Sequence, residues 1–299
     1  NYALNVGIED PVRDVAVRTL FRDLRFRKAL SYATDRDGIA QSIMRGPFLR
    51  GWAGGLYPGA PEFDKESVVY YPYDVASANI LLDEIGLKDT NGDGVREWTE
   101  GPMAGKPVVL QLIASQDAAE TQSVAEALVN QWGAVGIQIN MRIMDSATHT
   151  EVDNASTWDL SVTRGAQEFA LPFRNVTALA PITQNFVWHR EGDEPRVLMD
   201  FEQELIDIVT AYRSTFDPAE RRQLMFEYNR IFTENVYNLG VFVGRYGLGL
   251  AKRVKNVPDG TPAFMYQWVE DAILLDMLWT PEDQQLPQIR PNTIPVYSQ

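Results

Sequence analysis

A strand–helix–strand unit in the middle of the chain constrains its fold more than any other stretch. Pro107–Ala114 (PVVLQLIA) is a continuous apolar run typical of a buried strand, and Gly136–Met144 (GIQINMRIM) alternates as a second strand does. Asp117–Trp132 between them is predicted to be a helix, with an inward face made of Val124, Leu128 and Trp132. This order predicts parallel neighbouring strands joined by a right-handed crossover. The sequence therefore indicates an α/β fold.

Helices and further strands are expected on both sides of this unit. Asp23–Gly46 predicts two short helices, because its apolar residues recur at helical spacing, Asp35 offers an N-cap and Gly46 precedes a proline. Pro11–Phe21 is expected to be a short connector. Further helices are expected at Asp74–Leu87, Phe201–Tyr212 and Asp217–Asn235, and strands at Tyr2–Ile8, Trp158–Thr163 and Tyr237–Leu250.

The composition excludes several classes of function. A formal net charge of −14 repels phosphate backbones, so nucleic acid is not expected as a partner. The absence of cysteine excludes disulfides and thiol chemistry, and two histidines leave no basis for a histidine-rich metal site. No nucleophile elbow, phosphate-binding loop or Ser-His-Asp set is present in the sequence. An enzymatic activity is therefore not predicted.

A calcium-binding pattern lies between the Asp74–Leu87 helix and the first buried strand. The segment DTNGDGVREWTE matches the loop of an EF-hand, and its oxygen ligands would come from Asp89, Asn91, Asp93, Val95 and Glu100. The second helix of an EF-hand is not expected, because Gly101-Pro102 follows directly. Asn-Gly-Asp-Gly is also favourable turn chemistry without a metal. No cofactor is required by this sequence, and a structural calcium ion and a plain turn both remain open.

Several motifs, in order, resemble those of a known family. They are A-L-S-Y-A-T-D-R, L-L-D-E-I-G-L-K-D-T-N-G-D-G, the βαβ unit, the W-D-L strand, D-P-A-E-R-R-Q-L-M-F-E-Y-N-R-I-F-T-E-N and the final R-V-K-N-V-P. Each is weak alone, but together they resemble solute-binding protein family 5, the extracellular proteins that serve oligopeptide, dipeptide and nickel ABC importers. The resemblance extends roughly from Leu4 to Asp276.

The resemblance implies a periplasmic-binding-protein-like α/β fold (type II, large peptide-binding class). The chain would supply the second, C-terminal lobe, a mixed sheet flanked by helices. Residues 1–10 would belong to the first lobe or cross from it, and residues 11–246 would form the second lobe. Residues 247–299 would return to the first lobe and end in an extended tail. The sequence is therefore interpreted as a fragment that lacks the N-terminal lobe.

The implied function is binding without catalysis. The protein would hold a peptide or another small solute in an interlobe cleft and deliver it to the permease subunits of an ABC importer. Its location would be periplasmic or extracellular, with a lipoprotein anchor left open, although no signal peptide is present in this chain. The alternatives are a secreted carbohydrate-active enzyme and a calcium-stabilised extracellular binding module.

The resemblance also suggests a ligand-binding segment after the W-D-L strand. Alignment on that strand places Glu168 where the family often has an acid that meets a peptide's ammonium group, with Arg164 and Gln167 nearby. The aromatic loop after the second short helix adds Trp52 and Tyr57 as candidate ligand contacts. The family usually has aspartate rather than glutamate at this position, which leaves the class of ligand open. The alternative for Glu168 is an exposed loop acid.

Overall fold

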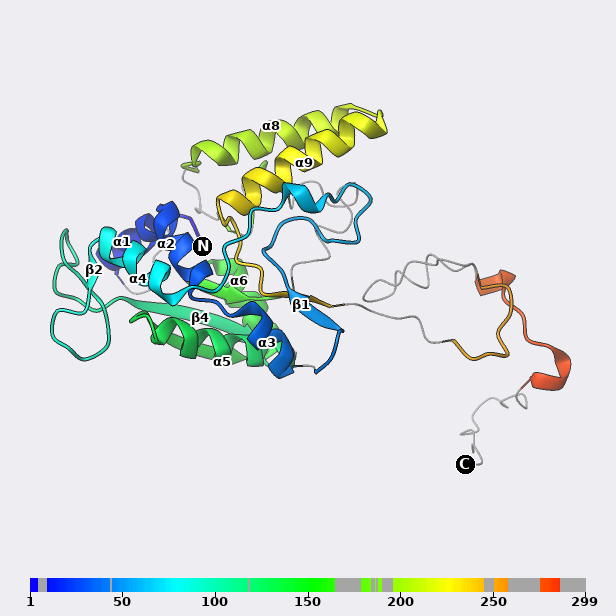
Figure 1. The fold of residues 1–299 in the computed structure, drawn as a ribbon, viewed down its shortest axis with the longest axis horizontal. Coiled ribbons are helices and arrows are strands. Elements are labelled where there is room, and N and C mark those ends of the chain that lie inside the picture. The colour runs from blue at the N-terminus through cyan, green and yellow to red at the C-terminus, as the bar shows by residue number, and fades with distance from the viewer. Residues whose placement is uncertain are drawn as a thin grey trace. The chain divides into compact units, whose positions relative to one another are not determined.

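The computed structural model describes residues 1–4, 10–43, 45–117, 119–164, 179–183, 186, 188–189, 196–244, 250–257 and 275–285 (Figure 1). The chain divides into two units, Asn1–Gly244 and Arg245–Gln299. The described part of the second unit contains two short 3-10 turns, η3 (Leu275–Met277) and η4 (Glu282–Gln284), and an antiparallel bridge between Lys255 and Trp279. Within the described residues, no helix is long and apolar enough to cross a membrane.

The first unit is built around a parallel sheet with the strand order β5-β4-β6. Its strands are β4 (Val109–Ser115), β5 (Gln138–Met144) and β6 (Leu160–Val162). Strand β4 lies in the middle, where Leu112 is in register with Met141 of β5 and Leu160 of β6. Helix α5 (Ala119–Gly133) connects β4 to β5 and buries the three predicted residues Val124, Leu128 and Trp132. The predicted parallel βαβ unit is therefore confirmed.

Among the described residues, four α-helices and the 3-10 helix η1 (Lys65–Ser67) precede the sheet in the chain. The α-helices are α1 (Pro11–Arg22), α2 (Leu24–Tyr32), α3 (Arg36–Ile43) and α4 (Val75–Glu84). Helices α2 and α3 confirm the two short helices predicted within Asp23–Gly46. Helix α1 was not expected, since Pro11–Phe21 had been predicted as a connector. That prediction was wrong because the side chain of Asp10 caps the helix by accepting the Arg13 N–H at 2.7 Å, and Pro11 occupies the first helical turn.

Two antiparallel strand pairs accompany the parallel sheet. Strand β1 (Leu49–Gly51) pairs with β7 (Phe242–Gly244), and β2 (Leu87–Lys88) pairs with β3 (Glu97–Trp98). Figure 1 shows β1 at the end of the parallel sheet toward which β4 runs, and the loop between β2 and β3 at the opposite end. The β1–β7 pair therefore lies beyond the carboxyl ends of the parallel strands, and the β2–β3 pair lies beyond their amino ends.

The other described helices of the first unit follow β5. Helix α6 (Ser146–Ala155) leads to β6, and α8 (Asp200–Ser214) packs against α9 (Pro218–Glu234) as a helical hairpin, visible in Figure 1. The side chain of Asp217 caps α9 and Pro218 occupies its first turn, as predicted. The apolar faces of α8 and α9 are buried and include Leu205, Val209, Tyr212, Met225, Tyr228 and Phe232.

A buried charge cluster joins α1 to the parallel sheet. Asp159, which directly precedes β6, is inaccessible to solvent and accepts hydrogen bonds from Arg13, Arg18 and the backbone N–H of Gln111 in β4. Arg13 is also nearly buried, and Arg18 is fully buried. This cluster holds the first helix, the central strand and the start of β6 together.

Candidate functional site

Arg164 lies at the carboxyl edge of the parallel sheet. It follows the end of β6 by two residues and forms an ion pair with Glu120, in the first turn of the helix that follows β4. Both side chains are partly exposed, at 38% and 37%. Open α/β sheets bind ligands outside the carboxyl ends of their strands, so this edge is where a solute is expected. Glu120 was not predicted from the sequence, although its place after a buried strand was a usable signal.

The other two residues of the predicted ligand segment, Gln167 and Glu168, lie outside the described residues. Their assignment as ligand contacts stays a prediction. Of the three predicted residues in this segment, Arg164 is the one whose position and contacts the structure describes.

Trp52 and Tyr57 lie in the loop that follows β1. The backbone N–H of Trp52 donates to Val241 O at 3.1 Å, which extends the β1–β7 pairing by one residue. The Trp52 ring is half-buried against the hydrophobic core, and Tyr57 is half-buried as well. Helix α3 contacts β1, β7 and α5, so the Trp52 segment and the helix that carries Glu120 flank a common element.

Hydrogen bonds with two side chains of α9 hold this loop in place. The side chain of Asn229 is fully buried; its carbonyl oxygen accepts the Leu56 N–H at 2.9 Å and its amide nitrogen donates to Ser67 Oγ at 2.7 Å. One helical turn further on, Thr233 Oγ1 accepts the Val69 N–H at 2.9 Å. The sequence analysis did not predict these contacts of Asn229 and Thr233 with the loop. An asparagine on the apolar face of α9, four residues after Met225, was the available signal.

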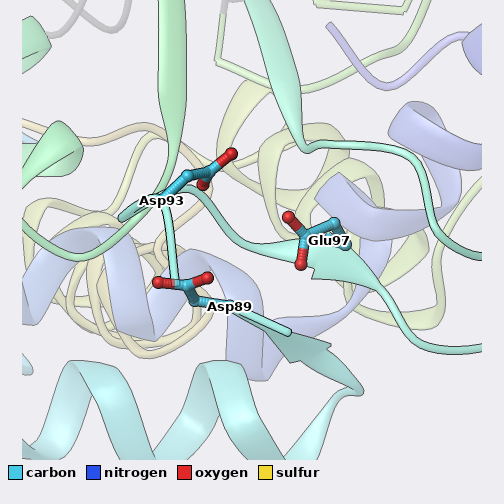
Figure 2. A group of neighbouring side chains, drawn as sticks. All are labelled: Asp89, Asp93 and Glu97. Carbon is cyan, nitrogen blue, oxygen red and sulfur yellow. The ribbon is translucent and has the colours of Figure 1, made fainter. Parts of the chain in front are cut away.

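The acidic loop between β2 and β3 brings three carboxylates together. Figure 2 shows the side chains of Asp89, Asp93 and Glu97. Their carboxylate oxygens lie within 4.8 Å of one another. Two of the predicted calcium ligands, Asp89 and Asp93, are thus neighbours, but the third acid is Glu97 rather than Glu100. Glu97 is nearly buried in β3 and was not predicted from the sequence.

Internal hydrogen bonds also organise this loop. Asp89 accepts the N–H groups of Gly92 at 2.6 Å and Gly94 at 2.9 Å, which lower the pKa of its carboxyl. The amide nitrogen of Asn91 donates to Asp93 Oδ2 at 3.1 Å and to Glu97 Oε1 at 2.9 Å. The carboxylates suit a hard cation such as calcium, while the same contacts stabilise a turn by themselves. Asn91 and Val95 stay predicted ligands, and the described geometry puts Glu97 in the place predicted for Glu100.

The acidic loop and the expected solute site lie at opposite ends of the parallel strands. Glu97 forms a bridge with Pro107, two residues before β4 begins, and the Arg96 N–H donates to Gly136 O just before β5. The loop is therefore at the amino edge of the parallel sheet, whereas Arg164 is at the carboxyl edge. A cation bound there would act on stability rather than contact the solute.

Comparison with solved structures places this architecture in the class of α/β periplasmic-binding-protein folds. The periplasmic binding protein MelB from Agrobacterium fabrum C58, solved in complex with stachyose, matches with a TM-score of 0.84 and 35% sequence identity over 95% of this chain and 43% of that chain. The oligopeptide-binding protein AppA from Bacillus subtilis, solved with a nonapeptide, matches with a TM-score of 0.65 at 18% identity over 88% of this chain and 49% of that chain, which supports the fold alone. The predicted fold class is therefore confirmed.

The chain belongs to the bacterial extracellular solute-binding proteins of family 5, whose middle-region model matches residues 1–182. The periplasmic alpha-galactoside-binding protein of Rhizobium meliloti (strain 1021) is 34% identical over 288 residues, which are 95% of this chain and 41% of that protein. The oligopeptide-binding protein AppA of Bacillus subtilis (strain 168) is 24% identical over 221 residues, 71% of this chain and 36% of that protein. The chain thus spans less than half the length of these relatives.

Family membership confirms the predicted class. The proteins of this family are binding components rather than enzymes, so the alternative of a carbohydrate-active enzyme is not supported. The predicted boundaries at residues 10 and 246 are not tested by these comparisons, and the division into lobes stays a prediction.

Proposed function

We propose that this chain is the second lobe of the solute-binding component of an ABC importer and that its solute is an α-galactoside-type oligosaccharide. The choice of solute rests on sequence identity, which is higher to saccharide-binding relatives than to oligopeptide-binding relatives. Two proteins described by an α-galactoside or by bound stachyose are 34% and 35% identical to this chain over 95% of its length. Relatives described as oligopeptide-binding range from 18% to 27% identity.

The charge balance at the carboxyl edge of the sheet is compatible with a neutral solute. Arg164 and Glu120 pair with each other, so these two charges offset one another at the edge. A peptide brings a charged ammonium and a charged carboxylate, each of which needs a counter-charge when water is excluded. An oligosaccharide brings hydroxyl groups and apolar ring faces, and the half-buried ring of Trp52 in the loop after β1 is a candidate aromatic surface.

The proposal extends to the partners and the location of the protein. The solute would be held between this lobe and an N-terminal lobe that lies outside this chain, and it would be passed to the permease subunits of the importer. The site of action would be the periplasm or the outer face of the cell.

Ligand-induced stabilisation tests the proposal directly. Thermal unfolding of the protein with its complete natural chain is measured with stachyose, with maltotetraose as a saccharide of similar size without galactose, and with pentaalanine as a peptide. Stachyose at a hundredfold excess over its Kd should stabilise the folded protein by about 2.7 kcal/mol. Maltotetraose and pentaalanine should have a much smaller effect. Stabilisation by pentaalanine but not by stachyose would refute the proposed solute and would favour a peptide importer.

A further inference from the structure

Glu120 lies where the buried face of α5 emerges at the carboxyl edge of the parallel sheet. The buried residues Val124 and Leu128 follow it one and two helical turns later, so the three side chains share one side of the helix. Helical side chains lean toward the amino end of their helix, which for α5 is the end next to the carboxyl edge. Glu120 is therefore directed toward the ends of the strands, whereas the exposed Glu126 lies on the outer side of α5.

The ion pair between Glu120 and Arg164 joins two different loops of this edge. The two residues are 44 positions apart, one after β4 and the other after β6. The loop after β4 is itself held in place, because the Gln116 N–H donates to Met144 O at the end of β5 at 2.8 Å. Gln122 Nε2 donates to Gln116 O at 2.7 Å, which ties the start of α5 to the same loop. A ligand that met this pair would therefore not have to order the loop that carries Glu120.

The pair is open to solvent at the place where a solute is expected. The side chains of Arg164 and Glu120 are 38% and 37% exposed. A carboxylate can accept several hydrogen bonds and a guanidinium can donate several, so a single mutual contact leaves both groups able to bond to a ligand. Because their charges offset each other, the pair offers a solute adjacent donors and acceptors rather than a net charge.

We propose that Glu120 and Arg164 together bind neighbouring hydroxyl groups of the oligosaccharide, with Glu120 accepting and Arg164 donating. A hydroxyl group both donates and accepts, so two neighbouring hydroxyls satisfy both members of the pair. The ammonium end of a peptide attracts Glu120 but is repelled by Arg164, and its carboxylate end meets the reverse, which disfavours a peptide at this point. This inference rests on the proposed function and adds Glu120, which the sequence did not single out, as a specificity residue.

Stachyose titration of the protein with its complete natural chain tests the inference. Glu120→Gln keeps the shape of the side chain but removes its charge. Because hydrogen bonds to a charged acceptor are the stronger ones, the affinity for stachyose should fall about 10-fold or more. Glu227→Gln is the matched control, since Glu227 on α9 is 39% exposed and pairs with Arg230; it should leave the affinity unchanged. Neither change should alter the melting temperature without solute appreciably, because exposed ion pairs contribute little to stability.

A double variant separates contact with the solute from a purely structural role. Arg164→Gln should also weaken stachyose binding, and Glu120→Gln combined with Arg164→Gln should weaken it more than either change alone. If the pair served only to hold the two loops together, one substitution would already break it, and the second would cost no further affinity.

The possible results distinguish this inference from the proposed function. If the wild-type protein binds no saccharide, the proposed function fails and the hydroxyl contacts fail with it. If the wild type binds stachyose and Glu120→Gln binds it equally well, the proposed function stands and the inference is overturned. A double variant that binds stachyose no more weakly than the single variants would also overturn the inference, because the ion pair would then act on the fold alone.

Discussion

Replacement of Asp159 by asparagine is expected to destabilise the folded chain strongly. The side chain is inaccessible to solvent, and its two carboxylate oxygens accept hydrogen bonds from two guanidinium groups and one backbone N–H. Arg13 is 7% exposed and Arg18 is fully buried, so neither can turn to water when the negative charge is lost. Asparagine keeps the shape but brings an N–H₂ group that cannot accept a hydrogen bond from a guanidinium.

The magnitude follows from the burial of this cluster. Removal of one partner of a buried, hydrogen-bonded ion pair costs about 3–5 kcal/mol, because the remaining charge is left without compensation. For a unit of 244 residues, at about 2–4 °C per kcal/mol, this corresponds to a fall of about 6–20 °C in melting temperature. An exposed pair offers a matched control. Asp23 and Arg25 are 28% and 51% exposed, and Asp23→Asn should cost less than about 1 kcal/mol.

The same cluster predicts a pH dependence. Burial by itself raises the pKa of the Asp159 carboxyl, but hydrogen bonds from Arg13 and the charges of Arg18 and Arg13 outweigh burial and hold the pKa below its usual value. A depressed pKa in the folded state means that the carboxylate stabilises the fold above its unfolded pKa of about 3.9. This contribution is lost as the pH falls through the lower folded-state value. The difference in stability between wild type and Asp159→Asn should therefore shrink below about pH 4.

Urea unfolding, followed by tryptophan fluorescence at neutral and acidic pH, measures these effects. The expected result is a large loss of unfolding free energy for Asp159→Asn at pH 7 and a small one for Asp23→Asn. If the two substitutions cost the same at pH 7, or if the cost of Asp159→Asn does not depend on pH, the reasoning from burial and charge would be refuted.

Two further predictions concern backbone packing and the acidic loop. Gly240→Ala should destabilise the fold by about 1–3 kcal/mol or more, since its Cβ would collide with backbone atoms of Gly54. Gly133→Ala at the end of α5 meets no atom within 4 Å and should stabilise it by about 0.4–1 kcal/mol, and chemical denaturation distinguishes the two signs. Millimolar calcium is expected to raise the melting temperature, with the rise abolished by Glu97→Gln and kept by Glu100→Gln. An unchanged melting temperature would remove the support for calcium.

Local signals in the sequence were sufficient to determine most helices and the central βαβ unit. Periodicity and caps act within one turn of a helix or one strand, so Asp217 and Pro218 mark the start of α9 without help from distant residues. The missed helix α1 carried the same kind of signal in Asp10 and Pro11. The burial of Arg13 in this helix could not be read locally, because its partner Asp159 lies 146 residues away.

Only the tertiary structure decided which side chains meet. The third acid of the loop is Glu97 rather than Glu100, because the β2–β3 pairing turns Glu97 toward Asp89. Asn229 reaches Leu56 across 173 residues, and the β1–β7 pair brings Trp52 beside Val241. The sequence by itself determined the α/β class and the resemblance to a family of binding proteins, since both depend on local order along the chain. The contacts of the candidate site depend on packing between distant segments, and no local pattern encodes that packing.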